Sequence, residues 1–242
     1  MKNDPKTVIV TGASQGIGAG IVRAFLARGY NVVATSRNAT KSRELSASEH
    51  VALIDGDIGQ FETARKTADL AIKKFGSIDA VAANAGIFSA KPFTEYTADD
   101  FNALVSTNLA GFMYITQLAV KQMLAQKSGG SIVSITAALV DNPIAGIPAA
   151  VPMMTKGGLN AALRSLALEY AKDQIRFNAV APGVVDTPLH AANPRGFLNT
   201  LSPMGTISTV EEIASAVVYL TEARQITGEV LHVDGGAHNG KW

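Results

Sequence analysis

The chain has 242 residues, of which 47% are hydrophobic and 17% charged, and its formal net charge at pH 7 is +1. That apolar content is sufficient for a buried core and excludes a disordered chain, and the near-neutral balance excludes bulk attraction to nucleic acid or to an anionic membrane. The chain has no cysteine, which excludes disulfides, thiolate metal ligands and cysteine nucleophiles.

Short apolar runs alternate with longer helical stretches along the whole chain, residues 1–242. The predicted strands are Thr7–Thr11, Asn31–Thr35, Val51–Ile54, Ala80–Ala83, Ser131–Ile135, Arg176–Ala181 and Val230–Val233. The predicted helices are Gly18–Arg28, Gln60–Phe75, Ala98–Gln126, Met154–Lys172 and Val210–Thr221. Most of these strands are continuous apolar runs, which is typical of parallel strands buried on both faces. The alternation predicts a single α/β domain with a doubly wound, seven-stranded parallel sheet and helices on both faces.

The first predicted strand leads into a glycine-rich loop, Gly12-Ala-Ser-Gln-Gly16-Ile-Gly18, and then into an amphipathic helix. The glycines allow a tight turn and close approach of the backbone to a pyrophosphate, and the helix N-terminus supplies N–H groups and a positive dipole end. This strand–loop–helix context is the one that a dinucleotide-binding motif requires. The predicted pyrophosphate-binding residues are Gly12, Ser14, Gln15, Gly16, Ile17 and Gly18.

The end of the second predicted strand indicates which dinucleotide fits. An acidic residue at that place hydrogen-bonds the ribose hydroxyls of NAD(H) and repels a 2′-phosphate. This chain instead has the neutral Ser36, followed by Arg37 and Asn38. Because a guanidinium binds a phosphate through two parallel hydrogen bonds, these residues favour NADP(H) over NAD(H). The alternative is that Arg37 is a solvated residue of a polar loop.

The glycine spacing, Thr-Gly-x-x-x-Gly-x-Gly, resembles the fingerprint of the short-chain dehydrogenase/reductase family, classical type. Other residues similar to that family's motifs follow in order along nearly the whole chain: Asp57-Ile58, Asn84-Ala85-Gly86, Asn108, Lys156-Gly-Gly, Pro182-Gly183, Thr187 and Val233-Asp-Gly-Gly. The resemblance implies a Rossmann fold and a dimer or tetramer built on the helices near 98–126 and 154–172. It also implies cofactor contacts at Asp57, Ile58, Asn84, Ala85, Gly86, Lys156, Pro182, Gly183, Val185 and Thr187.

The same resemblance exposes a gap in the catalytic residues. Members of the family usually combine an Asn, a Ser, a Tyr and a Lys, and here only Asn108 and Lys156 match. The Tyr position, four residues before the Lys, is Pro152, which cannot transfer a proton. The Ser position falls within 137–139, which reads Ala-Ala-Leu.

Several residues are candidates for the missing proton donor. Thr136 borders the position of the lost Ser, and His190 lies in a loop that usually covers substrate. Lys156 could act through water if its pKa were lowered, and Asp141 is a further candidate. The alternatives are a solvated loop histidine at 190 and a turn residue at 141.

The stretch 186–208 lacks helical or strand periodicity and contains three prolines and two glycines. A loop of this length in a compact domain is more often functional than idle, so we expect a substrate-covering insertion there.

Two functions remain compatible with these residues. One is an NADP(H)-dependent oxidoreductase with an atypical active site that acts on an unknown carbonyl or alcohol. The other is a non-catalytic NADP(H)-binding sensor or regulatory subunit. The N-terminus is polar, and we identify no run near the ~18 apolar residues of a membrane span. We therefore expect a cytoplasmic protein with a small-molecule substrate and without a metal, membrane or nucleic-acid partner.

Overall fold

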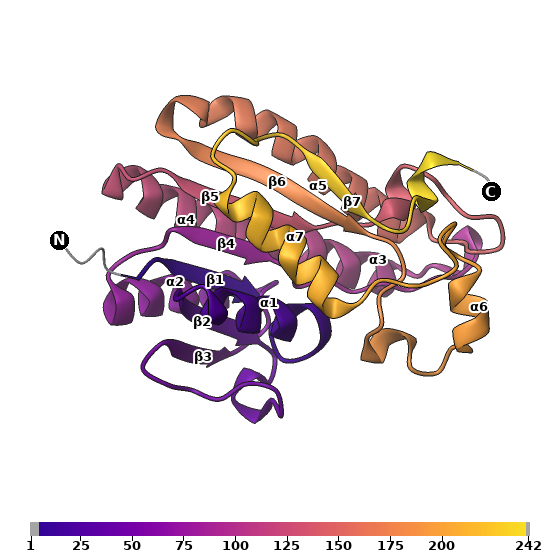
Figure 1. The fold of residues 1–242 in the computed structure, drawn as a ribbon, viewed down its shortest axis with the longest axis horizontal. Coiled ribbons are helices and arrows are strands. Elements are labelled where there is room, and N and C mark those ends of the chain that lie inside the picture. Colours follow the sequence, from indigo (N-terminus) through magenta and orange to yellow (C-terminus); the bar gives the residue numbers. More distant parts are fainter. Residues whose placement is uncertain (1–4, 241–242) are drawn as a thin grey trace.

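The computed structural model describes residues 5–240 and contains one seven-stranded parallel sheet (Figure 1). Its strands are β1 (Thr7–Thr11), β2 (Asn31–Ser36), β3 (Val51–Asp55), β4 (Ala80–Ala83), β5 (Gly130–Ile135), β6 (Ile175–Pro182) and β7 (Val230–Val233). They are arranged in the order β3-β2-β1-β4-β5-β6-β7, and every neighbouring pair is parallel. The predicted single-domain Rossmann fold is confirmed.

The α-helices are α1 (Gly16–Ala27), α2 (Phe61–Phe75), α3 (Ala98–Leu104), α4 (Gly111–Gln126), α5 (Ala150–Glu169), α6 (Arg195–Asn199) and α7 (Val210–Glu222). Figure 1 shows α1 and α7 side by side across one face of the sheet. Helices α2, α4 and α5 pack on the other face. This is the doubly wound arrangement expected when right-handed strand–helix–strand units are laid in both directions from the first strand.

Residues of β1 show why the strands are continuous apolar runs. Val8 and Val10 pack among side chains of α1 and α7, whereas Ile9 packs among side chains of α2, α4 and α5. Successive side chains of a strand point to opposite faces, and both faces of this sheet are covered. All three side chains are therefore fully buried.

Residues Ala98–Gln126 form one continuous helical stretch, in which a π-helical segment (Val105–Ala110) separates α3 from α4. It is the one helix in the described part of the chain that is long and apolar enough to cross a membrane, judged by length and composition only. In this fold α4 packs on α2 and on strands β4 and β5, which accounts for its apolar residues.

The loop predicted at 186–208 contains two short helical segments, a 3-10 turn (Pro188–His190) and α6. An isolated parallel bridge between Val185 and Ser208 closes its base. Within it Arg195 Nη1 lies 2.6 Å from Asp186 Oδ2. Figure 1 shows α6 beyond the carboxyl ends of the strands, on the side of the molecule where the candidate site lies.

Candidate functional site

A cavity of about 360 Å³ lies at the carboxyl ends of strands β1 to β4. The chain runs outward from β1 to β3 on one side and from β4 to β7 on the other, so the order of strands reverses between β1 and β4. Such a switch point leaves a crevice in which ligands of open α/β sheets bind. The sequence-predicted residues that line this cavity are Gly12, Ser14, Gln15, Ser36, Arg37, Asn38, Asp57, Ile58, Ala85 and Gly86.

Four lining residues were not predicted from the sequence: Thr35, Gly56, Ile87 and Thr107. Each of the four is adjacent in the chain to a predicted site residue. Their position at the ends of strands, or beside Asn108, could therefore have predicted them. The predicted residues outside the lining are Gly16, Ile17, Gly18, Asn84, Asn108, Lys156, Pro182, Gly183, Val185 and Thr187.

The glycine loop is packed too closely for side chains. A Cβ on Gly12, whose φ is +64°, would lie 2.8 Å from the Cα of Ala85. A Cβ on Gly18 would lie 2.2 Å from the carbonyl oxygen of Gly12 and 2.7 Å from Asn84 Nδ2. The Asn84 amide donates to the carbonyl oxygens of Thr11 and Gly12 at 3.0 and 3.1 Å. Gly18 and Asn84 thus shape the loop from behind.

The opposite wall of the cavity is formed by the end of β2. Arg37 is exposed, lines the cavity, and takes part in none of the ion pairs found within residues 5–240. Asp57 lines the cavity from the end of β3, and its Oδ1 accepts from the Gly59 amide at 2.9 Å. A cationic side chain without an acidic partner is therefore available at the rim.

These residues fit a dinucleotide. The Thr35 hydroxyl is completely buried in the cavity wall and has no hydrogen-bond partner within the described residues. Six other buried side-chain atoms of the described residues also lack a partner, so the fit rests on the backbone around Gly12 rather than on this hydroxyl. The cradle around Gly12 leaves backbone rather than side chains facing the cavity, as close approach to phosphates requires.

A second cavity, of about 320 Å³, lies on the other side of Gly16 beside Arg23, Glu44 and Glu211. Arg23 is already paired there, at 2.9 Å from Glu44 and 3.6 Å from Glu211. The three carboxylates of its lining, which include Asp186, disfavour phosphates. The cavity beside Arg37 is therefore the one suited to an anionic ligand.

The side chains of Asn108 and Lys156 both lie against Gly86. A Cβ on Gly86 would lie 2.9 Å from Lys156 Nζ and 3.3 Å from Asn108 Oδ1. Asn108 Oδ1 accepts from the Ile87 amide at 2.8 Å, and its Nδ2 donates to the Thr155 hydroxyl at 2.9 Å. The structure therefore brings together, at the edge of the cavity, the two residues that the family resemblance implies as catalytic.

Lys156 is a buried amine that has no carboxylate partner among residues 5–240. Its Nζ donates to the Ile135 carbonyl oxygen at 2.6 Å, and the side chain is 9% exposed. Burial lowers the pKa of the Lys156 ammonium to about 8, because removal from water penalises the charged form. A group with this pKa holds a proton at neutral pH and can release it readily.

Pro152 lies buried in the first turn of α5, one turn before Lys156. A proline is tolerated there because the first N–H groups of a helix have no partner inside the helix. Its carbonyl oxygen accepts from the Thr155 hydroxyl at 2.8 Å. The prediction that this helix begins near Met154 was wrong by one turn: the helix begins at Ala150, and its first turn accommodates the proline.

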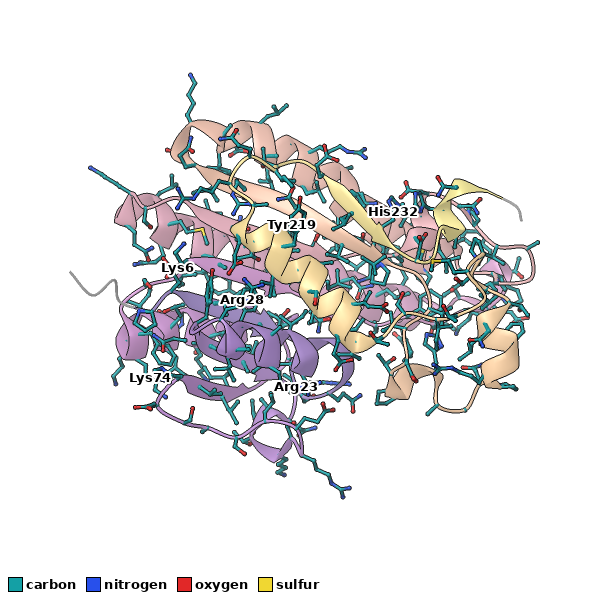
Figure 2. All side chains as sticks on the ribbon, viewed as in Figure 1. Lys6, Arg23, Arg28, Lys74, Tyr219 and His232 are labelled. Atoms are coloured by element: carbon teal, nitrogen blue, oxygen red, sulfur yellow. The ribbon has the colours of Figure 1, made fainter. Side chains whose placement is uncertain are left out.

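The other proton-donor candidates are placed as follows. The Thr136 hydroxyl is buried and donates to the Val180 carbonyl oxygen at 3.4 Å, so it is directed at β6. Asp141 Oδ2 lies 2.8 Å from Nε2 of His232 on β7, which Figure 2 labels. His190 is in the turn after Thr187, and its ring makes no hydrogen bond within residues 5–240.

The predicted residues that follow β6 lie beside the glycine loop or the C-terminal segment. The Thr187 methyl group is 3.4 Å from where a Cβ on Gly16 would be. A Cβ on Gly183 would lie 2.9 Å from Asp234 Cβ, and Asp234 in turn contacts His238 Nδ1 at 2.9 Å. The rings of His238 and His232 stack at 3.8 Å. This histidine pair had no signal in the sequence, because Asp141 is 91 residues away from its partner His232 and the stacking of the two rings depends on the fold.

Comparison with known proteins gives consistent matches. The family model described as enoyl-(acyl carrier protein) reductase matches residues 12–238. The chain is 34% identical to 3beta-hydroxysteroid dehydrogenase 1 of Eggerthella lenta, over 96% of this chain and 93% of that one. It is similar to 3-ketoacyl-(acyl-carrier-protein) reductase from Brucella melitensis complexed with NADH (TM-score 0.90, 26% identity, 97% and 99% covered). It is also similar to ElxO with NADP bound (TM-score 0.86, 28% identity, 97% and 99% covered).

Proposed function

We propose that this chain, which belongs to the short-chain dehydrogenase/reductase family of oxidoreductases, uses NADP(H) to interconvert a carbonyl and an alcohol on a small-molecule substrate. The observation that carries the proposal is the buried Lys156 ammonium held beside Gly86 at the edge of a cavity that fits a dinucleotide. The similar 3-ketoacyl-(acyl-carrier-protein) reductase and ElxO structures hold NADH and NADP, respectively, which supports a nicotinamide cofactor.

The nicotinamide, when bound, donates or accepts the hydride. The Lys156 ammonium places a positive charge and a mobile proton near Gly86, where a carbonyl oxygen becoming an alkoxide is stabilised. Because its pKa is about 8, Lys156 is the best-suited proton donor among the residues at this site. Asn108, saturated by Ile87 and Thr155, fixes the backbone around Gly86.

Pro152 and Ala138 make this active site atypical in our proposal. A missing general acid typically lowers the rate by 10²–10⁴, roughly. Holding the hydride donor and acceptor together can still supply about 7–11 kcal/mol in favourable cases. We therefore expect a slow reductase rather than an inert chain.

The test is a titration with NADPH and with NADH, followed by a turnover screen against panels of carbonyls and alcohols. We expect saturable binding of NADPH and turnover of at least one substrate. Absence of binding for both dinucleotides contradicts the proposed function.

A non-catalytic sensor is the second candidate. It is favoured by the buried Thr136 hydroxyl, which donates to the Val180 carbonyl oxygen and so does not replace the missing Ser. Tight NADPH binding without turnover, even in the Pro152→Tyr/Ala138→Ser double variant, would favour the sensor. Turnover that appears only in the double variant would show that the wild-type chain has lost its chemistry. His190→Ala tests the remaining donor, and we expect it to retain turnover.

The cofactor preference gives a sharper prediction. Arg37→Asp should reverse the preference from NADPH to NADH, because a carboxylate at that place repels a 2′-phosphate and accepts from ribose hydroxyls. Arg43→Asp is the matched control: it makes the same charge change on an exposed residue of the same segment, outside the cavity lining. The measurement is the ratio of the two dissociation constants. Equal affinity for both cofactors in the wild-type chain, or the same change in the control, contradicts the assignment.

We also propose that segment 186–208 covers the substrate and that the chain forms a dimer or tetramer in the cytoplasm. Two exposed apolar side chains on α5 support assembly, Met154 at 54% and Leu168 at 83% exposure. Such side chains are commonly covered by a partner subunit.

A further inference from the structure

Arg37 lies in the segment between β2 and the 3-10 turn Ala39–Lys41, and a carboxylate at the end of the neighbouring strand β3 binds this turn. Ser36 pairs with Asp55 in the β2–β3 ladder, and the Gly56 amide donates to the Ser36 carbonyl oxygen at 2.9 Å. Asp55 then reaches past Arg37 to Thr40. Its Oδ1 accepts from the Thr40 amide at 2.8 Å, and its Oδ2 accepts from the Thr40 hydroxyl at 2.5 Å.

The contact is specific and charge-assisted. Thr40 is in a single 3-10 turn (Ala39–Lys41), so the carboxylate accepts from an amide at the start of a helical turn. Hydrogen bonds from the Thr40 side chain and backbone lower the pKa of the Asp55 carboxyl, so Asp55 is ionised at neutral pH. Asp55 does not line the cavity, and it therefore acts from behind the segment.

The rest of the segment is also attached. Ala39 is fully buried, and the Ser42 hydroxyl donates to the Ser14 carbonyl oxygen of the glycine loop at 2.7 Å. The Asn38 amide donates to the Ser36 hydroxyl at 3.3 Å. Arg37 is thus left as an exposed cation on a short backbone segment held at both ends and facing the cavity.

We infer that Asp55 and Thr40 are positioning residues for cofactor selection, which hold the backbone so that the Arg37 guanidinium meets the 2′-phosphate of NADP(H). The inference rests on the proposed function and deepens it. A binding group that is ordered before the ligand arrives loses less freedom on binding, and the gain applies only to ligands that touch it. NADH lacks the 2′-phosphate, so the clamp between Asp55 and Thr40 should not affect its affinity.

The deciding variant is Thr40→Val, which keeps the shape and the net charge but removes the hydroxyl that donates to Asp55. NADPH affinity should fall about fivefold, and NADH affinity should change less than about twofold. Thr40→Ser retains a hydroxyl and should restore wild-type values. In an Arg37→Ala background, Thr40→Val should have no further effect on NADPH affinity, because the group that it positions is gone.

A second readout is independent of the cofactor. Hydrogen exchange of the Thr40 amide should be faster in Asp55→Ala, because that amide loses its acceptor. An unchanged exchange rate overturns the inference. The inference is also overturned if Thr40→Val leaves the NADPH-to-NADH affinity ratio unchanged. It is overturned as well if Thr40→Val lowers NADPH affinity as much in the Arg37→Ala background as in the wild-type chain. If the wild-type chain itself does not prefer NADPH, the proposed cofactor preference fails and the inference fails with it; the other failures leave that preference standing.

Discussion

Replacing Lys156 by methionine is expected to stabilise the folded chain near pH 7 by up to about 3 kcal/mol, since its pKa falls from 10.5 to about 8 on burial. The same change is expected to lower turnover by a factor on the order of 10² or more, because it removes the proposed proton donor. Methionine has a similar length and no charge to desolvate. The figure for stability is an upper limit, because the bond to the Ile135 carbonyl oxygen already offsets part of the penalty.

The pH dependence follows from the direction of the pKa shift. Below pH 8 the amine is protonated in both the folded and the unfolded chain, so the full penalty of burying the charge is present. Between about pH 8 and 10.5 the folded chain releases its proton first, and the wild-type stability rises relative to the variant. The stability difference should therefore be largest below pH 8 and disappear above 10.5.

The measurement is denaturant unfolding of the two chains at several pH values, with NADPH-dependent turnover measured on the same samples. Lys121→Met is the control, because it removes an exposed lysine from α4. It should leave both stability and turnover unchanged. A Lys156→Met variant with full turnover, or with a stability difference independent of pH, contradicts the role assigned to this amine.

Gly18→Ala is expected to weaken cofactor binding strongly, because a single methyl group there displaces the glycine loop. The added Cβ would lie 2.2 Å from the Gly12 carbonyl oxygen, which is backbone and cannot rotate away. The glycine loop must shift, and we expect the unfolding free energy to fall by about 1–3 kcal/mol. NADPH affinity should fall by at least about tenfold, because a misplacement of the pyrophosphate cradle affects every phosphate contact.

Gly196→Ala is the matched control. This glycine is in α6, and an added Cβ would have no heavy atom within 4 Å. Alanine should be neutral or slightly stabilising there. Thermal unfolding and NADPH titration of both variants check the prediction. Wild-type affinity in Gly18→Ala would show that the loop is not packed as described.

Local patterns were sufficient for the framework of this protein. The strands β1, β4 and β7 begin and end as predicted. For β1 and β4 the reason is that a buried parallel strand is a short apolar run bounded by other residue types. The glycine loop and Arg37 were also visible, since their chemistry depends on adjacent residues. The short helices of segment 186–208 were missed, because prolines and the absence of periodicity hide helices of one turn.

The hydrogen-bond partners of Thr136, Asp141 and Lys156 are distant from them in the chain. The Thr136 hydroxyl is directed at Val180, Asp141 lies against His232, and Lys156 donates to the carbonyl oxygen of Ile135. Hydrogen bonds and burial are set by which strands become neighbours, and spacing along the chain does not encode them. The proposed dinucleotide site could therefore be recognised from a contiguous motif. By contrast, the buried Lys156 and the clamp between Asp55 and Thr40 exist only because the fold places separate segments within reach of one another.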